Sequence, residues 1–397
     1  MKAKRPCPVC NAGEVDMLHI QRFELPQGHP LAAGYEVVVC SACGFIYADT
    51  AVTQADYDRF YAEHSKYEDA KTGTGGVENP FDWKRQQETA RQIADVLKDV
   101  NANILDVGCA NGGMLKALKE LGYENLCGID PSPVCVENTR RLGVEVHQGS
   151  LFLPFKENAY DCVILSHTLE HVQDVRGAVD WIGKRLKPGG MVYIETPDAA
   201  RYVDFIYAPL QDFNTEHINH FSLTSLRNLM EAQGFVFVEG VAKDLVVGRE
   251  MFYPAVFGFW KRAGESAGVM LKKDTLLLPK IEEYITRSKK MMSNIDARIA
   301  ELIARTPSII VWGAGQLSMK LLAETSLARA DILAFADNNP INHGQVLHGK
   351  PILSPAELAK WNAPILIATL LHHRSIAKQI REMGLKNEIV FLVGETE

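Results

Sequence analysis

Short apolar runs alternate with helical patterns in the middle of the chain. Before the first run, "FDWKRQQETARQIADVLKDV" (81–100) has apolar residues at helical spacing, and helical segments also separate the runs. Such a strand–helix alternation predicts an α/β fold with a parallel, doubly wound sheet. The runs are "NILDVG" (103–108), "NLCGID" (125–130), "VEVHQGS" (144–150), "YDCVILS" (160–166) and "GMVYIETP" (190–197).

The same alternation restarts after Pro307 and predicts a second, smaller Rossmann-like unit of about 90 residues. Its apolar runs are "SIIVWGAG" (308–315), "DILAFADNN" (331–339), "PILIATLL" (364–371) and "EIVFLVG" (388–394).

Two other segments lack this alternation. The N-terminal one shows no long helical pattern and ends in the Gly/Thr-rich stretch "KTGTGG". The other begins with the aromatic run "MFYPAVFGFW" (251–260) and continues as a charged amphipathic pattern, which predicts a pair of connecting helices. The expected parts are an N-terminal cysteine-bearing domain (1–75), a first Rossmann-like domain (76–244), connecting helices (245–305) and a second Rossmann-like domain (306–397).

Composition narrows the classes of protein. With 397 residues, 47% of them apolar and 23% charged, the chain is typical of a globular protein with two or three domains. A net charge of −7 disfavours nonspecific binding to nucleic acid. The start, "MKAKRPCPVC", has no apolar leader, and no apolar stretch reaches the roughly 18 residues of a spanning helix. We therefore expect a cytoplasmic protein without a membrane or nucleic-acid partner, and the oligomeric state stays open.

Four cysteines near the N-terminus form two pairs with metal-ligand spacing. "CPVC" (Cys7 and Cys10) and "CSAC" (Cys40 and Cys43) are separated by 29 residues. Two such knuckles let four thiolates converge on a tetrahedral zinc, which stabilises a segment that has little core of its own. Because this set fills all positions on the ion, we expect the zinc to be structural; Gly13 and Gly44 stand where each knuckle would turn.

A glycine turn follows the first strand of the central domain. In "ILDVGCANGGMLKALKELG" the strand brings Asp106 to the turn, which runs from Gly108 to Gly112, and a helix starts near Gly113. The turn alone is compatible with a dinucleotide site. The next strand ends at Asp130, about 20 residues on, where an acid accepts hydrogen bonds from a ribose diol.

These motifs, with "SLFLPF" (150–155) after the third strand and "LSHTLEHV" (165–172) after the fourth, resemble the class I S-adenosylmethionine-dependent methyltransferases across residues 84–240. The resemblance implies that Asp106 and the turn face the methionine part of the cofactor, Asp130 the ribose, and Ser150–Leu151 the adenine. The cofactor-binding residues implied are Asp106, Gly108, Cys109, Gly112, Asp130, Pro131, Ser150, Leu151, Ser166 and His167.

Some of these positions have a structural interpretation as well. Many relatives carry an acid where Ser150 stands, so adenine recognition here would rest on backbone groups. Cys109 is better explained as a small buried residue than as a nucleophile. Glu170 and His171 lie with His167 at the carboxyl edge of the sheet, where they either meet a ligand or brace the turn.

The order of parts, together with the "EH" pair in "TEHINHFSLTSL" (215–226), resembles the sugar C-methyltransferases that act on nucleotide-linked 4-keto-deoxysugars. The resemblance implies removal of a proton beside the ketone and attack of the resulting enolate on the cofactor's methyl group. This chemistry needs a base that titrates near neutral pH and a group that stabilises the oxyanion. His217 is then the base and Glu216 its orienting neighbour.

The chain departs from that family around the "EH" pair. Asn214 and Thr215 stand where members commonly show a tyrosine and a histidine, and His220 stands where an aromatic residue is more usual. Asn214 retains a donor for an oxygen, and His220 is a neighbour of the site or a substitute acid. Tyr67, with Tyr61 as the alternative, is a candidate for the missing hydroxyl; packing of the N-terminal segment is an equal explanation.

The last domain carries a weaker motif. "VWGAGQLSMKLL" predicts a strand, a glycine turn and a helix, with Asp337 about 22 residues beyond Gly315. It fits a second dinucleotide, a platform for the nucleotide-linked sugar with Gly313, Gly315 and Gln316 near a phosphate, or close strand–helix packing. The "HHR" triplet of His372–Arg374 either contacts an anionic substrate or begins a solvated helix.

The favoured function is therefore methyl transfer from S-adenosylmethionine to carbon of a nucleotide-activated keto-sugar. One alternative keeps the cofactor and moves the methyl to oxygen or nitrogen of a sugar or other small metabolite. Another is a zinc-ribbon, RNA-binding methyltransferase, which the net charge and the absence of Lys/Arg runs near the knuckles disfavour.

Overall fold

The computed structural model describes residues 1–63, 75–264 and 271–394, and these residues divide into two compact units. The division differs from the expected one, because the predicted boundaries at 75/76 and 244/245 both lie inside unit 1. Unit 2 also includes two excursions, which are segments from earlier parts of the chain. Unit 1 contains Met1–Leu18, Val38–Phe205 and Glu216–Ile281, and unit 2 contains His19–Val37, Ile206–Thr215 and Glu282–Glu397.

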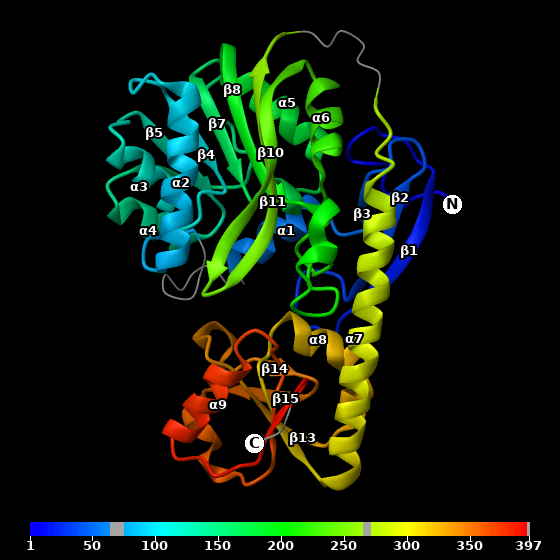
Figure 1. The fold of residues 1–397 in the computed structure, drawn as a ribbon. Coiled ribbons are helices and arrows are strands. Elements are labelled where there is room, and N and C mark those ends of the chain that lie inside the picture. The colour runs from blue at the N-terminus through cyan, green and yellow to red at the C-terminus, as the bar shows by residue number, and fades with distance from the viewer. Residues whose placement is uncertain (64–74, 265–270, 395–397) are drawn as a thin grey trace. The chain divides into compact units, whose positions relative to one another are not determined.

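A twisted central sheet forms the middle of unit 1, in the strand order β10-β11-β8-β7-β4-β5-β6 (Figure 1). The strands from β4 to β8 pair in parallel, as the alternation predicted, whereas β11 is antiparallel to both β8 and β10. The strands are β4 (Ile104–Val107), β5 (Leu126–Asp130), β6 (Glu145–Gln148), β7 (Tyr160–Ser166), β8 (Leu186–Pro197), β10 (Phe235–Gly248) and β11 (Met251–Arg262).

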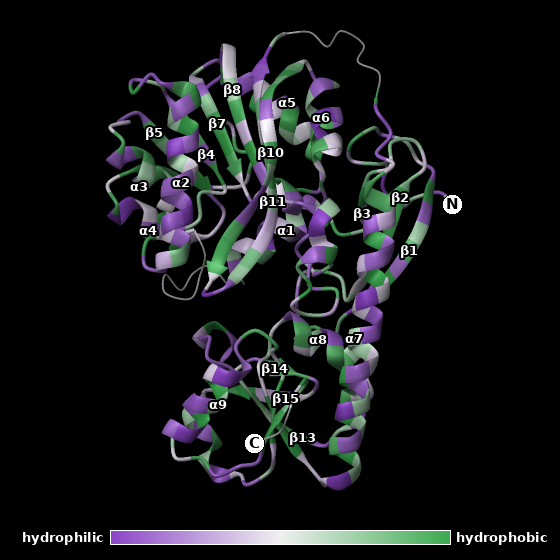
Figure 2. Cartoon of the chain, viewed as in Figure 1, coloured by the Kyte–Doolittle hydropathy of each residue, from purple (hydrophilic) through white to green (hydrophobic). Residues whose placement is uncertain are grey.

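Helices cover both faces of this sheet because its central strands are apolar on both sides. In β4, Ile104 packs with residues of α2, α3 and α4, whereas its neighbour Leu105 packs with residues of α5 and α6. Figure 2 shows the central strands largely in hydrophobic colours. The helices are α1 (Gln54–Glu63), α2 (Pro80–Leu97), α3 (Gly113–Glu120), α4 (Pro133–Arg141), α5 (Val175–Arg185) and α6 (Leu223–Glu231), with the short 3₁₀ helices η1 (Leu169–His171) and η2 (Ala199–Asp204).

The prediction of two connecting helices in 245–305 is wrong for its first half. Residues 251–262 are strand β11, inserted between β8 and β10, and its middle residues from Pro254 to Trp260 are buried. A strand covered on both sides reads as a continuous apolar run, which periodicity cannot distinguish from a buried helix.

The N-terminal residues form a second sheet in the order β1-β2-β3-β9. Its last strand comes from the segment that contains the "EH" pair, since Ile46 of β3 pairs with His220 of β9. The cysteine-bearing part packs into the same apolar cluster as the central sheet, through residues such as Val9 and Phe45. The strands are β1 (Val15–Arg22), β2 (Gly34–Cys40), β3 (Ile46–Asp49) and β9 (Asn219–His220).

Unit 2 has its own sheet, in the order β14-β15-β13-β12-β16-β17, which confirms the second α/β unit. The long helix α7 (Leu277–Arg305) leads into it and alternates hydrophobic and hydrophilic colours along its length in Figure 2. The remaining elements are β12 (Ile309–Trp312), α8 (Gln316–Glu324), η3 (Ser326–Arg329), β13 (Ile332–Ala336), η4 (Pro340–Asn342), β14 (Val346–Leu347), β15 (Lys350–Leu353), η5 (Pro355–Lys360), β16 (Ile365–Ile367), α9 (His373–Glu382) and β17 (Ile389–Phe391).

The excursions join unit 2 through buried hydrogen bonds. Lys320 of α8 donates to Gln21 Oε1 at 2.7 Å, and the Asp212 amide donates to the hydroxyl of Tyr284 at 3.0 Å. Among the described residues, no helix has the length and hydropathy to cross a membrane.

Candidate functional site

The glycine turn between β4 and α3 has the geometry that its sequence predicts. Gly108 and Gly112 have φ of +76° and +75°, in the left-handed region that favours glycine. A Cβ on Gly108 would lie 2.5 Å from Thr168 Oγ1, and one on Gly112 would lie 2.8 Å from Thr139 Oγ1. The turn is therefore closely packed as well as conformationally demanding.

Asp130 holds this turn from the end of β5. Its Oδ2 accepts the Ala110 amide at 2.8 Å and its Oδ1 accepts the Ser132 amide at 2.9 Å. Burial raises the pKa of Asp130 to about 6, against these hydrogen bonds. Burial, helped by the charge of Asp130, also raises the pKa of Asp106 to about 7. Two buried carboxylates at one turn favour a ligand that brings positive charge and hydroxyl donors.

A cavity that is partly open to solvent lies at the carboxyl ends of β4, β5 and β7. Of the predicted cofactor-binding residues, the structure brings all but Gly112 to its wall, and Gly112 packs instead against Thr139 and Leu142. The predicted lining residues are Asp106, Gly108, Cys109, Asp130, Pro131, Ser150, Leu151, Ser166 and His167; those that the sequence did not indicate include Gln54, Asp58, Arg85, Gln86, Met114 and Cys135.

His167 occupies an unusual place at the end of β7. Its φ is +53°, rare for a residue with a side chain, and its ring lies between two carboxylates. Nδ1 is 3.3 Å from Glu170 Oε1, and Nε2 is 3.1 Å from Glu195 Oε1. Burial alone would lower the pKa of His167, but hydrogen bonding to Glu170 and Glu195 and their charges raise it above its ordinary value. The ring is thus stabilised as an imidazolium.

Glu195, at the end of β8, is fully buried and bound on two sides. Lys243 of β10 forms an ion pair with Glu195 Oε2, and the hydroxyl of Tyr193 donates to the same oxygen at 2.5 Å. Burial raises the pKa of Glu195, but the larger combined effect of Lys243 and His167 holds it well below the usual range. This carboxylate is therefore ionised.

A second set of groups lies on η1 and on the segment that carries the "EH" pair. His171 Nδ1 is 3.1 Å from the carbonyl oxygen of Glu216 and 2.9 Å from the hydroxyl of Tyr61. The other ring nitrogen of His171, Nε2, faces Glu170 Oε1 at 3.8 Å. The rings of His171 and His217 meet edge to face, with centroids 4.9 Å apart. We call His171 and His217 the imidazole pair; His171 and Tyr61 also line the cavity.

The chain matches a family model for a methyltransferase domain over residues 81–239, which contain the turn, most of the cavity wall and the imidazole pair. Residues 81–239 are a methyltransferase domain. The predicted fold class, a Rossmann-like sheet of the class I methyltransferases, is confirmed. The prediction of an S-adenosylmethionine-dependent methyltransferase domain is confirmed as well. Residues 306–391 match a second model, described as C2185-like, N-terminal.

Several curated proteins are similar to part of the chain. One is the mitochondrial arginine-hydroxylase NDUFAF5 of Danio rerio, 30% identical over 39% of this chain and 52% of the relative. A probable S-adenosylmethionine-dependent methyltransferase of Mycolicibacterium smegmatis is 24% identical over 42% and 63%. The ubiquinone biosynthesis O-methyltransferase of Methylocella silvestris is 34% identical over 23% and 39%. The chain thus spans about half the length of the curated relatives it matches.

Among solved structures, the [4+2]-cyclase SpnF is 16% identical over 53% of this chain and 97% of its own, with a TM-score of 0.42.

The methyltransferase domain fits the cofactor that its family uses. S-adenosylmethionine carries a sulfonium, an ammonium and a ribose diol. Asp106 and Asp130, both buried and both with a raised pKa, are the groups whose ionised forms a bound cation or hydroxyl would stabilise.

The remaining predicted catalytic residues are His220, Asn214 and Tyr67. His220 is fully buried in β9, where burial lowers its pKa to about 3, so it does not serve as an acid near neutral pH. Asn214 lies in unit 2, with its amide 3.3 Å from the carbonyl of Gln211 and its own carbonyl bound to Tyr35. Tyr67 lies outside the described residues, whereas its alternative Tyr61 faces the cavity.

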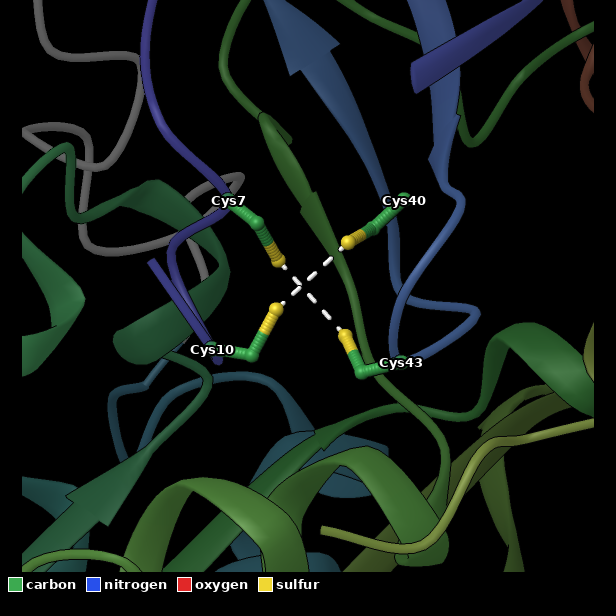
Figure 3. Close-up of side chains that lie close together, drawn as sticks. All are labelled: Cys7, Cys10, Cys40 and Cys43. Carbon is green, nitrogen blue, oxygen red and sulfur yellow. Dashed lines mark hydrogen bonds between the residues drawn. The ribbon is translucent and has the colours of Figure 1, made fainter. Parts of the chain in front are cut away.

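The four N-terminal cysteines converge as predicted (Figure 3). The sulfurs of Cys7 and Cys43 are 3.6 Å apart, and those of Cys10 and Cys40 are 3.5 Å apart. A tetrahedral zinc with Zn–S bonds of about 2.3 Å would separate its sulfurs by roughly 3.8 Å. The residues present therefore fit such an ion.

The two knuckles share one backbone pattern but turn differently. The amides of Asn11 and Gly44 donate to the carbonyls of Cys7 and Cys40 at 2.8 and 2.9 Å. Gly44 has φ of +78°, as the prediction of a tight turn requires, but in the first knuckle Asn11, with φ of +62°, takes this role rather than Gly13.

The glycine turn of unit 2 is closed by protein groups. Asp337 accepts the Ala314 amide at 2.8 Å, and Ser318 donates to the carbonyl of Gly313 at 2.6 Å. The side chain of Gln316, predicted to approach a phosphate, instead donates to Thr215 Oγ1 at 2.7 Å.

The structure places the "HHR" triplet at the start of α9, as its solvated-helix interpretation predicts. His373 begins this helix and its Nδ1 lies 2.8 Å from the carbonyl oxygen of Leu370.

Proposed function

We propose that the protein transfers a methyl group from S-adenosylmethionine to a carbon beside the keto group of a nucleotide-linked sugar. The observation that carries this proposal is the imidazole pair at the edge of the cofactor cavity, with His171 on the cavity wall and His217 against it. An imidazole that accepts a proton there could generate a carbon nucleophile next to the cofactor's methyl group.

The reaction proceeds in two steps. His217 takes the proton from the carbon beside the ketone, and the C–H electrons form an enolate. The enolate carbon then attacks the methyl carbon, which forms a C–C bond, breaks the S–CH₃ bond and releases S-adenosylhomocysteine. Glu216 orients the base from the adjacent position, and the hydroxyl of Tyr61 on the cavity wall is suited to donate to the enolate oxygen.

The sugar as acceptor rests on the resemblance in the order of parts, namely paired cysteines, methyltransferase domain, "EH" pair and second α/β unit. The names of relatives favour an alternative that keeps the cofactor. Two of them are ubiquinone biosynthesis O-methyltransferases, from Methylocella silvestris and Bordetella avium. Transfer to an oxygen of a small metabolite is therefore the second candidate, and it needs the same cavity.

We also propose that the four cysteines bind one structural zinc ion. All four sulfurs lie within 4.8 Å of one another, and three of the cysteines are buried in the core of unit 1. Such an ion is expected to stabilise the N-terminal sheet. Metal analysis of purified protein should give about one zinc per chain, lost together with solubility in Cys40→Ser; Cys135→Ser, a buried cysteine outside the cluster, is the control.

The deciding experiment uses methyl-labelled cofactor and a panel of 4-keto nucleotide sugars. Separately, hydrogen exchange with deuterated solvent beside the ketone is followed in the presence of S-adenosylhomocysteine, which permits enolate formation without transfer. Label on carbon, together with exchange that disappears in His217→Ala while cofactor binding remains, is the expected result. Label on oxygen, or exchange that is unchanged in His217→Ala, would count against the proposal.

A further inference from the structure

A row of buried charges lies behind the imidazole pair. It runs from Lys243 on β10 through Glu195 and His167 to Glu170 on η1, and we call these four residues the charge row. Lys243 pairs with Glu195, whose other oxygen is 3.1 Å from His167 Nε2. The other ring nitrogen, Nδ1, is 3.3 Å from Glu170 Oε1.

The row alternates in sign and is balanced when His167 is an imidazolium: two cations face two carboxylates. Both glutamates are almost fully buried, with side chains that are 1% exposed. Their negative charges are sustainable in the interior only because cations compensate them. His167 is held in a left-handed backbone conformation at the point where it bridges the two.

Glu170 and Glu195 differ in the contacts that they make besides those with His167. Apart from the contact of Oε1 with His167, neither of the oxygens of Glu170 accepts a hydrogen bond within the described part of the chain. One of them, Oε1, faces His171 Nε2 at 3.8 Å. When the His171 ring carries two protons, one of them is on Nε2, on the side that faces this carboxylate. The Glu170 carboxylate therefore lies where it would stabilise a positive charge on the ring.

We propose that Lys243, Glu195 and His167 are positioning residues that hold the Glu170 carboxylate as a fixed negative charge behind the imidazole pair, so that the pair can hold the proton taken from the acceptor. This inference rests on the proposed function, since it requires a proton to leave the acceptor. The proton from the acceptor carbon moves to the pair, and the positive charge there is stabilised by Glu170 on one side and by Glu216 on the other. Among the described residues, the hydroxyl of Tyr61 also faces His171 and Glu216.

The first test removes the outer cation. In Lys243→Met one cation, His167, remains between two carboxylates, so Glu195 and Glu170 compete for it and Glu170 is no longer held as a fixed charge. Solvent exchange beside the ketone and turnover are expected to fall about tenfold or more. The pH at half-maximal exchange should move to lower pH, because the pair loses a neighbouring negative charge. Cofactor affinity should stay within about twofold, since Lys243 is not on the cavity wall. Lys261→Met, an exposed lysine on β11, is the matched control and should change nothing.

The second test uses the pair of outer charges. Glu195→Gln alone leaves Lys243 without its partner, but the double variant Lys243→Met/Glu195→Gln removes one cation and one anion and leaves His167 facing Glu170. If the row acts through charge balance, the double variant should exchange faster than Lys243→Met. Losses that simply add would show that the two side chains contribute packing only, and the inference would be overturned.

Two other outcomes separate this inference from the proposed function. If the wild-type protein catalyses no exchange with any keto-sugar, the proposed function fails. If the wild type does exchange and Lys243→Met matches it in rate and pH profile, the inference alone fails. A competing explanation is a cation on Glu170, His171 and His217, whose ligand atoms lie within 4.8 Å of one another. Exchange that is lost on dialysis against a chelator and restored by added Mg²⁺ or Zn²⁺, with a second metal per chain, would overturn the inference.

Discussion

The two glycine turns of this chain, after β4 and after β12, share a pattern of backbone hydrogen bonds but differ in the side chains around them. In each, the acid that ends the second strand accepts an amide of the turn and an amide two residues further on: Asp130 accepts from Ala110 and Ser132, and Asp337 from Ala314 and Asn339. All four distances are 2.8 or 2.9 Å.

The two turns differ in the side chains next to this shared backbone pattern. Asp106 stands two residues before Gly108, whereas Val311 stands two residues before the equivalent Gly313; both glycine amides donate to the second strand, to Ile129 and Ala336 respectively. The first turn therefore has a second buried carboxylate and a cavity beside it. In the second, Gln316 and Ser318 are bonded to other parts of the chain. A glycine turn in the sequence thus predicts the backbone conformation, and the neighbouring side chains decide whether the turn suits a charged ligand.

The largest expected contrast concerns the glycines themselves. Gly108→Ala should lower the free energy of unfolding by about 3 kcal/mol, because φ is positive and the new Cβ would meet Thr168 at 2.5 Å. Gly315→Ala should leave it unchanged or raise it by a few tenths of a kcal/mol, since nothing lies within 4 Å of its Cβ position. Urea unfolding midpoints measure both, and an equal loss in the two variants would contradict the difference in packing.

The next contrast compares the acids. Asp106→Asn should weaken binding of S-adenosylmethionine by about 2 kcal/mol, roughly thirtyfold, because we expect this carboxylate to stabilise the positive charge of the cofactor. Asp337→Asn is the matched control and should leave cofactor affinity unchanged. Isothermal titration calorimetry decides it, and an equal effect of the two substitutions would mean that the second turn also contributes to cofactor binding.

The pH dependence of cofactor binding sharpens the comparison. Burial raises the pKa of Asp106 to about 7, and the cationic cofactor binds its ionised form. Affinity should therefore be constant above pH 7 and fall by up to about tenfold, or 1.4 kcal/mol, for each pH unit below it. In Asp106→Asn this decline should become shallower. A wild-type profile that is flat from pH 5.5 to 8.5 would contradict the assignment.

The smallest effect is expected at Gln316. Gln316→Ala removes its hydrogen bond to Thr215 and should lower the free energy of unfolding by about 1 kcal/mol. Cofactor affinity should not change, because the bond belongs to unit 2. Denaturation and calorimetry on the same preparation test both statements; weakened cofactor binding would show that this turn reaches the site.

The parallel core of both units was predictable because apolar runs and turns are local signals. The same holds for the cysteine cluster, since the spacing of its two pairs is already that of a metal site. The antiparallel strands β10 and β11 were missed, because a short apolar run fits a buried helix equally well. With them, Lys243 was missed, as its role depends on β10 reaching Glu195 across the fold.

Other parts of the site needed three-dimensional information. His167 and Glu195 are 28 residues apart, but the register of β7 on β8 places Ser166 opposite Glu195, so the ends of two parallel strands bring them together. No local sequence pattern indicates that residues 19–37 and 206–215 belong to unit 2. Their place there depends on contacts between residues distant in the sequence, such as Lys320 with Gln21. This is why the sequence did not indicate that Asn214 belongs to unit 2.

The seam between β3 and β9 connects the cysteine cluster with the imidazole pair. Strand β3 starts three residues after Cys43, and β9 starts two residues after His217. Arg5, two residues before Cys7, donates to the carbonyl of Ile218 at 3.0 Å. The two cysteine knuckles are therefore connected to the segment that carries His217. Loss of the proposed zinc is expected to slow the proposed proton removal and to leave binding of the proposed cofactor unchanged.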